Sequence, residues 1–321
     1  MTRQAPQVSV VLPTYNGGEH LAESVSSALS QSFGDLELIV VDDGSTDGST
    51  DALPADPRLG LVRQPHSGVS AARNRGAKEA QAPLVAFLDA DDRWLPEKLE
   101  RQVETLRAHP DALLCYSAFA VIDPSGARLS ATLGGEDCTY VSLFAYNPIP
   151  VPTVLMPRKV LLEAGGFDPC YSVGEDWDLW LRLALQGSFC CVPDCLVEVR
   201  VAPHNAGQAS GSDPWLTCLQ GFSVLGRHEI GALQTGDTAV LAAIRRARRQ
   251  TRLECSARAA ALFADSVGWP PRPNWAMART AFRIRPFRGG VTIAHLLLRR
   301  ARHDWLARSR PERSAESVAR S

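Results

Sequence analysis

The stretch that decides the fold is residues 8–49, VSVVLPTYNGGEHLAESVSSALSQSFGDLELIVVDDGSTDGS. It begins with an apolar run at 8–13, turns at Asn-Gly-Gly, and continues with apolar residues at helical spacing over 19–31. A second apolar run at 36–42 ends in an acidic, glycine-rich turn. Apolar strands joined by a helix predict a parallel sheet with helices on both faces, which is the α/β fold class.

The same alternation continues along the chain. Further strands are predicted at 59–64 and 84–89, and further helices at 69–80 and 96–108. Right-handed crossovers place the carboxyl ends of parallel strands at one edge of the sheet, where open α/β sheets bind ligands. Three polar clusters fall at that edge: Pro13-Thr14-Tyr15-Asn16, Asp42-Asp43-Gly44-Ser45 and Asp89-Ala90-Asp91-Asp92. We therefore expect one ligand site there.

The second half of the chain is less regular. It predicts a strand at 112–123, a proline-punctuated stretch at 148–157, an amphipathic helix from Glu175 to Ala184 and a strand at 196–201. Beyond about residue 214 the pattern is helical and rich in arginine. The expected organisation is an α/β domain over 1–213, made of a regular half (1–110) and a less regular half (111–213), followed by a basic helical region over 214–321.

Composition describes a globular chain with an uneven distribution of charge. Of 321 residues, 45% are hydrophobic and 21% charged, which excludes a wholly disordered, collagenous or coiled-coil protein. No apolar run is long enough to span a bilayer and no signal segment opens the chain, so we expect a cytoplasmic location. Residues 1–240 hold 30 acidic and 16 basic residues, whereas 241–321 hold 5 acidic residues and 18 arginines. The two parts are therefore expected to have different partners.

The arginine-rich region has three interpretations. Residues 245–252 and 279–302 could form amphipathic helices on an anionic membrane, which would place the protein at the inner face of the plasma membrane. They could instead contact nucleic-acid phosphates, a partner that we do not expect here, or form a solvated face against the acidic domain.

The acidic cluster after the strand at 84–89 indicates a cation site. Asp89, Asp91 and Asp92 repel one another unless a cation or hydrogen-bond donors lie nearby, and oxygen ligands favour Mg²⁺ or Mn²⁺. The alternative is a helix cap with acids in its first turn. The neighbouring Cys190, Cys191 and Cys195 lack a Cys-x-x-Cys pair, so inert thiols are favoured there over a metal site.

These motifs together resemble a known enzyme family. VSVVLPTYNGGEHLAESVSSALSQSFGDLELIVVDDGSTDGS, GVSAARNRGA, VAFLDADDRWLPEKL and GEDWDLWLRL are similar, in order and spacing, to the family 2 inverting glycosyltransferases. The resemblance covers roughly residues 7–205. It implies the GT-A nucleotide-diphospho-sugar transferase fold, a Rossmann-like, mostly parallel sheet with helices on both faces. It also implies that 1–213 is the glycosyltransferase domain, with a nucleotide-binding half over 1–110 and an acceptor-side half over 111–213.

The resemblance also implies roles for individual residues. Asp176 would be the catalytic base and Glu175 its neighbour on the acceptor side, while Asp91 would hold Mn²⁺ or Mg²⁺ on the diphosphate. His204 would assist at the metal, and with Arg200 it would lie on a loop that closes over the diphosphate. The residues expected to bind the nucleotide-sugar are Pro13, Thr14, Tyr15, Asp42, Asp43, Arg73, Asp89, Trp177 and Arg200. Trp177 has a second interpretation as a core residue.

The reaction needs these residue types for physical reasons. Transfer of a glycosyl group leaves a nucleoside diphosphate with new negative charge, which a divalent cation stabilises, and a carboxylate can take the proton of the attacking hydroxyl. We expect a UDP-sugar as donor, a sugar or lipid-linked acceptor, and a role in the synthesis of a cell-surface polysaccharide, lipopolysaccharide or glycoconjugate. The alternatives are a sugar nucleotidyltransferase and a non-catalytic nucleotide-binding or membrane-scaffold relative.

Overall fold

The computed structural model describes residues 5–135, 138–144, 147–201 and 214–266. Its strands are β1 (Val8–Thr14), β2 (Leu36–Asp42), β3 (Leu59–Arg63), β4 (Leu84–Phe87), β5 (Arg93–Trp94), β6 (Leu114–Ile122), β7 (Val154–Pro157) and β8 (Phe189–Arg200). Its α-helices are α1 (Leu21–Leu29), α2 (Val69–Glu79), α3 (Lys98–Ala108), α4 (Tyr140–Leu143), α5 (Arg158–Glu163), α6 (Glu175–Ala184), α7 (Pro214–Thr235) and α8 (Thr238–Ser266). Short 3₁₀ turns lie at Gly18–His20, Ser49–Ala52 and Val151–Thr153.

The strands form one mixed sheet in the order β3-β2-β1-β4-β7-β6-β8-β5. The first four strands in this order are parallel, whereas β7 runs antiparallel to both β4 and β6. The register pairs Thr14 with Asp42, so β1 and β2 end side by side. The predicted α/β class is confirmed, and the carboxyl ends of β1, β2 and β4 share one edge of the sheet.

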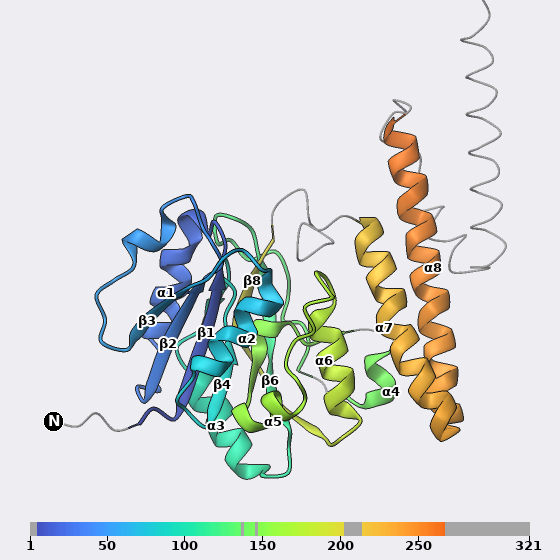
Figure 1. The fold of residues 1–321 in the computed structure, drawn as a ribbon, viewed down its shortest axis with the longest axis horizontal. Coiled ribbons are helices and arrows are strands. Elements are labelled where there is room, and N and C mark those ends of the chain that lie inside the picture. The colour runs from blue at the N-terminus through green and yellow to red at the C-terminus, as the bar shows by residue number, and fades with distance from the viewer. Residues whose placement is uncertain (1–4, 136–137, 145–146, 202–213, 267–321) are drawn as a thin grey trace, which may run out of the picture. The chain divides into compact units, whose positions relative to one another are not determined.

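Helices cover both faces of the sheet (Figure 1). On β1, Val10 and Leu12 point to the face covered by α1 and α3, and Val11 points to the face covered by α2 and α6. The strands are apolar on both sides for this reason, in agreement with the continuous runs in the sequence.

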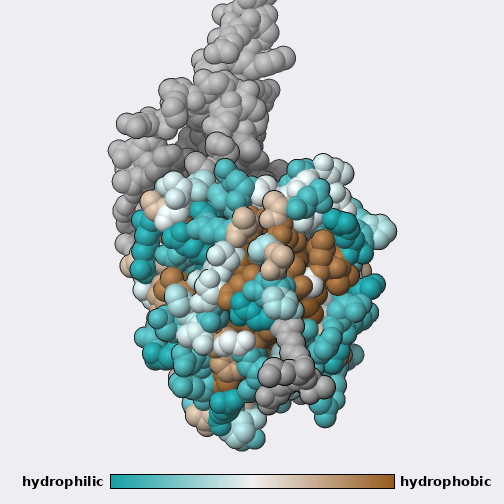
Figure 2. Space-filling model, turned by 90° about the vertical axis from the view of Figure 1, so that its left-hand side faces the viewer, coloured by the Kyte–Doolittle hydropathy of each residue, from teal (hydrophilic) through white to brown (hydrophobic). Residues whose placement is uncertain are grey.

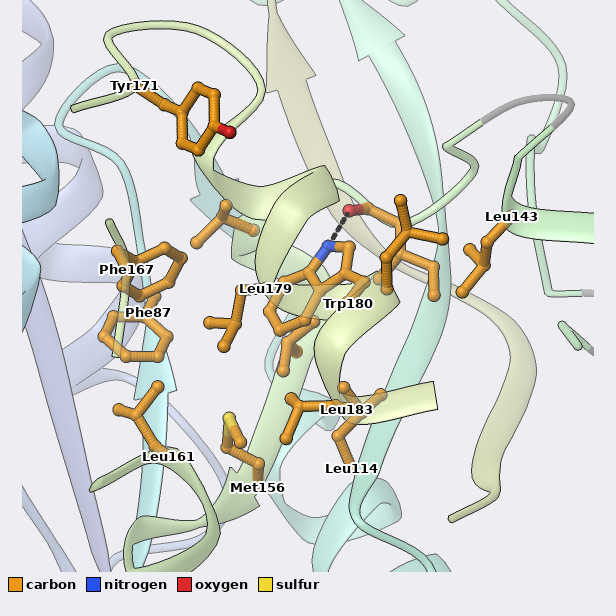
Figure 3. Packing of buried hydrophobic residues seen from close by; sticks show 14 of the residues in the cluster. Phe87, Leu114, Leu143, Met156, Leu161, Phe167, Tyr171, Leu179, Trp180 and Leu183 are labelled. Atoms are coloured by element: carbon orange, nitrogen blue, oxygen red, sulfur yellow. Dashed lines mark hydrogen bonds between the residues drawn. The ribbon is translucent and has the colours of Figure 1, made fainter. Parts of the chain in front are cut away.

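Trp180 of α6 lies at the centre of the core on the α2 side (Figure 3). Its side chain is fully buried among residues that include Met156, Phe167 and Leu183. The indole Nε1 donates a hydrogen bond of 3.0 Å to the Ile149 carbonyl, so its one polar atom is satisfied. This packing fixes the helix that begins with Glu175 and Asp176.

The outer strand β3 leaves one edge of the sheet open. On the side of the molecule where β3 lies, apolar side chains gather near the middle and polar side chains surround them (Figure 2). Leu61 of β3 is 38% exposed. An edge strand of only five residues, with glycine at its second position, limits pairing with other chains.

The chain separates into two compact units, residues 1–247 and 248–321. The first unit extends past residue 213, where we expected the catalytic domain to end, because α7 packs against α6. Val224 and Leu225 of α7 are buried in the same cluster as Trp180. Among the described residues, no helix is both long and apolar enough to cross a membrane.

Candidate active site

The predicted polar clusters meet at the carboxyl edge of the sheet. The backbone N–H of Asp43 donates to the Thr14 carbonyl at 2.8 Å, which joins the ends of β1 and β2. Gly17 lies close to the end of β1 and to the turn that follows β4. A Cβ atom at Gly17 would stand 2.5 Å from Thr14 Oγ1 and 3.6 Å from the Cβ of Ala90. The sequence needs glycine at this position because any side chain would collide with the Thr14 hydroxyl.

Asp43 is buried and holds the loop that leads into α2. Its carboxylate accepts hydrogen bonds from the backbone N–H of Ser67 at 2.9 Å and of Gly68 at 2.8 Å, and from the Gln64 amide at 2.7 Å. His66 Nδ1 lies 2.9 Å from the same carboxylate. The role in reading a base, which the resemblance implies for Asp43, stays a prediction; the observed contacts give it a structural task as well.

The exposed Tyr15 stacks on His66, with ring centroids 4.0 Å apart. Sequence patterns predicted Tyr15 as a nucleotide contact but gave no reason to select His66. Beside this pair, a hollow of about 570 Å³ is lined by residues that include Asp42, Ser45, Arg63 and Gln64. A planar aromatic surface next to a polar hollow can accommodate a nucleobase.

Asp42 is buried in the wall of this hollow. Its carboxylate accepts hydrogen bonds from the Ser45 N–H at 2.8 Å and from the Thr50 hydroxyl at 3.2 Å. Burial alone would disfavour the charge, but the hydrogen bonds from Ser45 and Thr50 lower the pKa of Asp42. The wall of the hollow therefore holds an ionised carboxylate, with the Nε atom of Arg63 3.5 Å from it.

Arg73 connects the two halves of the site. Its guanidinium is buried and donates to Asp89 at 2.7 Å and to Glu175 at 2.8 Å. Burial opposes its charge, but Asp89 and Glu175 raise the pKa of Arg73 above its ordinary value. This bridge brings the residue after β4 and the first residue of α6 together, although 86 positions separate Asp89 from Glu175 in the sequence.

Asp176 follows Glu175 in the first turn of α6. It accepts a hydrogen bond of 3.0 Å from the Asn147 amide. Burial, and then the neighbouring charge of Glu175, raise the pKa of Asp176 to about 7. A carboxylate with a pKa near the working pH suits a general base.

Trp177 lies beside Asp176 as part of the core. Its indole Nε1 donates to the Leu143 carbonyl at 2.7 Å, and its ring packs against the main cluster on the α6 side. This contact favours the core interpretation of Trp177, and the sugar contact stays a prediction.

Asp91 and Asp92 differ sharply in environment. Asp92 is buried, and its carboxylate accepts the backbone N–H of Arg200 at 2.7 Å. Burial and the adjacent Asp91 raise the pKa of Asp92 well above its ordinary value. Asp91 is exposed, and desolvation together with Asp89 raises its pKa as well. Within the described part of the chain, no side chain donates a hydrogen bond to the Asp91 carboxylate.

Arg200 corrects one expectation. It was predicted to lie on a loop that closes over a diphosphate, but its side chain is buried at the end of β8. Its guanidinium donates to the carbonyls of Asp91 at 2.8 Å and Pro124 at 2.9 Å, and it pairs with Glu23. Arg200 therefore holds the backbone of the loop that carries Asp91. His204 lies outside the described residues.

Three structural participants had no signal in the sequence. Each of them contacts a predicted site residue that is far away in the sequence. Asn147 donates to Asp176, 29 positions away. Glu23 pairs with Arg200, and His66 stacks on Tyr15. Only the tertiary structure brings these side chains to the site.

Comparison with known proteins supports the resemblance to the family 2 glycosyltransferases. The family model "Glycosyl transferase family 2" matches residues 9–152. A putative teichuronic acid biosynthesis glycosyltransferase of Bacillus subtilis, TuaG, is 33% identical over 213 residues, which are 64% of this chain and 83% of that protein. An uncharacterized glycosyltransferase of Nostoc sp. is 39% identical over 187 residues, or 54% of this chain and 56% of its own.

Solved structures share the fold. TarS 1–349 of S. aureus in complex with UDP-GlcNAc superposes with a TM-score of 0.54 at 17% identity, covering 83% of this chain and 93% of that one. TarS 1–349 in complex with UDP has a TM-score of 0.50 at 20% identity, with 67% of this chain and 65% of that one covered. The GT-A fold is thus confirmed, and the chain belongs to glycosyltransferase family 2.

Proposed function

We propose that this chain is a metal-dependent, inverting glycosyltransferase that moves a sugar from a nucleoside-diphosphate donor to an acceptor hydroxyl. The observation that carries the proposal is the Asp89–Arg73–Glu175 bridge, with contacts of 2.7 Å and 2.8 Å. It holds the acidic turn after β4 next to the helix that begins with Glu175 and Asp176. Membership of the family favours this reaction over nucleotidyl transfer.

The proposed base is Asp176. An acceptor hydroxyl must lose a proton as it attacks the anomeric carbon, and a carboxylate within hydrogen-bond reach can accept it. The Asn147 amide donates to one oxygen of Asp176 at 3.0 Å and the Trp177 N–H donates to the other at 2.6 Å, so the carboxylate is held in one orientation. One base and one direct displacement invert the anomeric configuration, whereas retention by double displacement would require a nucleophile on the opposite face of the sugar.

Asp91 is the proposed protein ligand of Mn²⁺ or Mg²⁺. Its exposed carboxylate, crowded by Asp89 and Asp92, fits a hard cation that prefers oxygen ligands. Within the described residues, no group of three or more His, Cys, Asp or Glu side chains forms a closed metal cage. One or two carboxylates plus substrate phosphates are the usual ligand set of such cations. When bound, the cation would neutralise charge on the leaving diphosphate.

The donor and acceptor are proposed on chemical grounds. The Tyr15–His66 stack and the hollow next to it suit a nucleobase, and the TarS structures were solved with UDP and UDP-GlcNAc. We propose a UDP-sugar as donor. The name of the Bacillus subtilis relative refers to teichuronic acid biosynthesis, and we propose a comparable sugar or lipid-linked acceptor in cell-surface polysaccharide synthesis.

A binding experiment tests donor and metal together. Thermal-shift screening of UDP-, GDP-, dTDP- and CMP-sugars, with and without Mn²⁺, should single out a UDP-sugar with Mn²⁺. In calorimetry, Asp91→Ala should abolish the Mn²⁺-dependent part of UDP affinity. The matched control is Asp194→Ala, which removes an exposed carboxylate paired with Arg101. Equal Mn²⁺-linked affinity in wild type and Asp91→Ala would overturn the metal role.

We also propose that α8 binds an anionic membrane surface. The side chains of Arg245, Arg246, Arg249 and Arg252 on this helix are exposed. Replacing all four with Gln should reduce sedimentation with vesicles that contain phosphatidylglycerol, and should leave binding to neutral vesicles unchanged. Identical partitioning of both proteins on the anionic vesicles would refute this interaction.

A further inference from the structure

Arg227 of α7 donates hydrogen bonds both to α6, the helix that carries Asp176, and to the loop that precedes α6. Arg227 donates to the Asp178 carboxylate, with its Nη1 3.0 Å and 3.1 Å from the two oxygens, and its Nη2 contacts Asp168 at 2.5 Å. The guanidinium also lies 5.3 Å from the centre of the Tyr171 ring. Asp178 stands two residues after Asp176 in α6, and Asp168 and Tyr171 belong to the loop before it.

The loop is held from its other side by α2. The Asn74 amide donates to the Phe167 carbonyl at 2.7 Å, and its oxygen accepts the Phe167 N–H at 2.9 Å. This arrangement requires glycine at position 166, because a Cβ atom there would stand 2.3 Å from the Asn74 oxygen. The segment that leads to Glu175 is therefore clamped between Asn74 of α2 and Arg227 of α7.

Asp178 has no exposed surface, so its charge depends on these partners. Arg182, one turn later in α6, donates to it at 2.8 Å, and Arg182 also reaches the Gly166 carbonyl at 2.7 Å. Arg182 thus ties α6 to the same loop, but from within the helix. Arg227 is different because it reaches the buried carboxylate from another helix, α7.

A second contact between α7 and the site passes through His228. This side chain is buried, and its ring lies 5.8 Å from that of Phe144 and 6.2 Å from that of Tyr140. The same α4 segment supplies the Leu143 carbonyl that accepts the Trp177 indole N–H. Of the two residues that follow Asp176 in α6, Trp177 is bonded to α4, which His228 of α7 contacts, and Asp178 is bonded to α7 itself.

We propose that Arg227 is a positioning residue for the transfer reaction: through Asp178 and Asp168 it sets the place of the first turn of α6, and hence of Asp176. This inference rests on the proposed role of Asp176 as the base. Without Arg227, Arg182 is the remaining arginine that donates to the Asp178 carboxylate among the described residues. The loop before α6 also loses the contact between Arg227 and Asp168. The nucleotide half, which lies on β1, β2 and β4, keeps its own contacts.

The first test needs no substrate. In hydrogen–deuterium exchange, Arg227→Ala should speed the exchange of peptides covering 166–178 at least tenfold, with no change in peptides of β1, β2 and α3. Arg227→Lys, which keeps the charge but cannot contact both carboxylates bidentately, should give an intermediate effect. Arg101→Ala, which breaks an arginine–aspartate pair whose two side chains are exposed, is the control and should change exchange only near α3 and β8.

The second test separates positioning from simple loss of folded protein. With the donor sugar that wild type uses best, Arg227→Ala should lower kcat at least tenfold and leave the affinity and stoichiometry of UDP binding unchanged. Unchanged exchange over 166–178, or a fall in kcat matched by the same fall in UDP stoichiometry, would overturn the inference. Failure of wild type itself to transfer any sugar would instead count against the proposed function, and the exchange result would still decide the clamp.

Discussion

The substitution Asp176→Asn tests the electrostatics of the site through stability. A carboxyl group whose pKa is raised in the folded state binds its proton more tightly there than in the unfolded chain. The pKa of Asp176 is raised from 3.8 to about 7, so the wild-type protein loses stability as pH rises from about 4 to about 7, and the loss is complete above that range. Asparagine has the same shape and no titration, so the variant escapes this loss.

The expected size follows from the shift. Each pKa unit corresponds to about 1.4 kcal/mol, so a shift of roughly three units corresponds to about 4 kcal/mol. The side chain keeps some contact with solvent, which reduces the penalty, and we expect Asp176→Asn to be more stable than wild type by about 2–3 kcal/mol at pH 8. At pH 4, where Asp176 carries its proton in the folded state, the variant should have no such advantage and should be less stable by about 1 kcal/mol, because the asparagine oxygen can accept from only one of the two donors, Asn147 and the Trp177 N–H.

Urea denaturation at pH 4, 6 and 8, without divalent cations, measures this difference. Asp111→Asn, which changes an exposed carboxylate in the turn after α3, serves as the control for the substitution itself. The reasoning is refuted if Asp176→Asn is destabilised at pH 8, or if its advantage over wild type is the same at all three pH values.

Three further outcomes follow from the structure. Asn147→Ala removes a hydrogen bond that lowers the pKa of Asp176, so the acid limb of the kcat/KM profile should move up by about one pH unit, and an unmoved limb would contradict the contact. Gly76→Ala would place a Cβ atom 2.3 Å from Val11 Cγ1 between α2 and β1, and urea denaturation should show a loss of about 1–3 kcal/mol; a neutral effect would argue against this close approach. Nuclear magnetic resonance of the product formed from an α-linked donor should show a β-linkage, and an α-linkage would exclude inversion.

The sequence predicts the elements whose signals are local. The helix expected at 69–80 is α2, Val69–Glu79, and its start follows Gly68, a glycine with positive φ. The helix expected from Glu175 to Ala184 has those bounds in the structure. Periodicity and breakers act within a few residues, so they are readable without the fold.

Elements and contacts that depend on distant partners could not be predicted in this way. β8 begins at Phe189 rather than 196, because its first residues pair with β6 beyond the apolar run that the sequence displays. Arg200 looked like a free cation for a diphosphate, but Glu23, 177 positions away, and two backbone carbonyls enclose it. The direction of β7, antiparallel between β4 and β6, is likewise set by tertiary pairing alone.

The most direct test of the central claim compares Asp176→Asn with wild type in one preparation. Donor affinity is measured by calorimetry with Mn²⁺, and sugar transfer is measured by release of the nucleoside diphosphate in the presence of acceptor. The account predicts wild-type donor affinity together with a loss of turnover of at least a hundredfold. Turnover equal to that of wild type would contradict the assignment of Asp176 as the base.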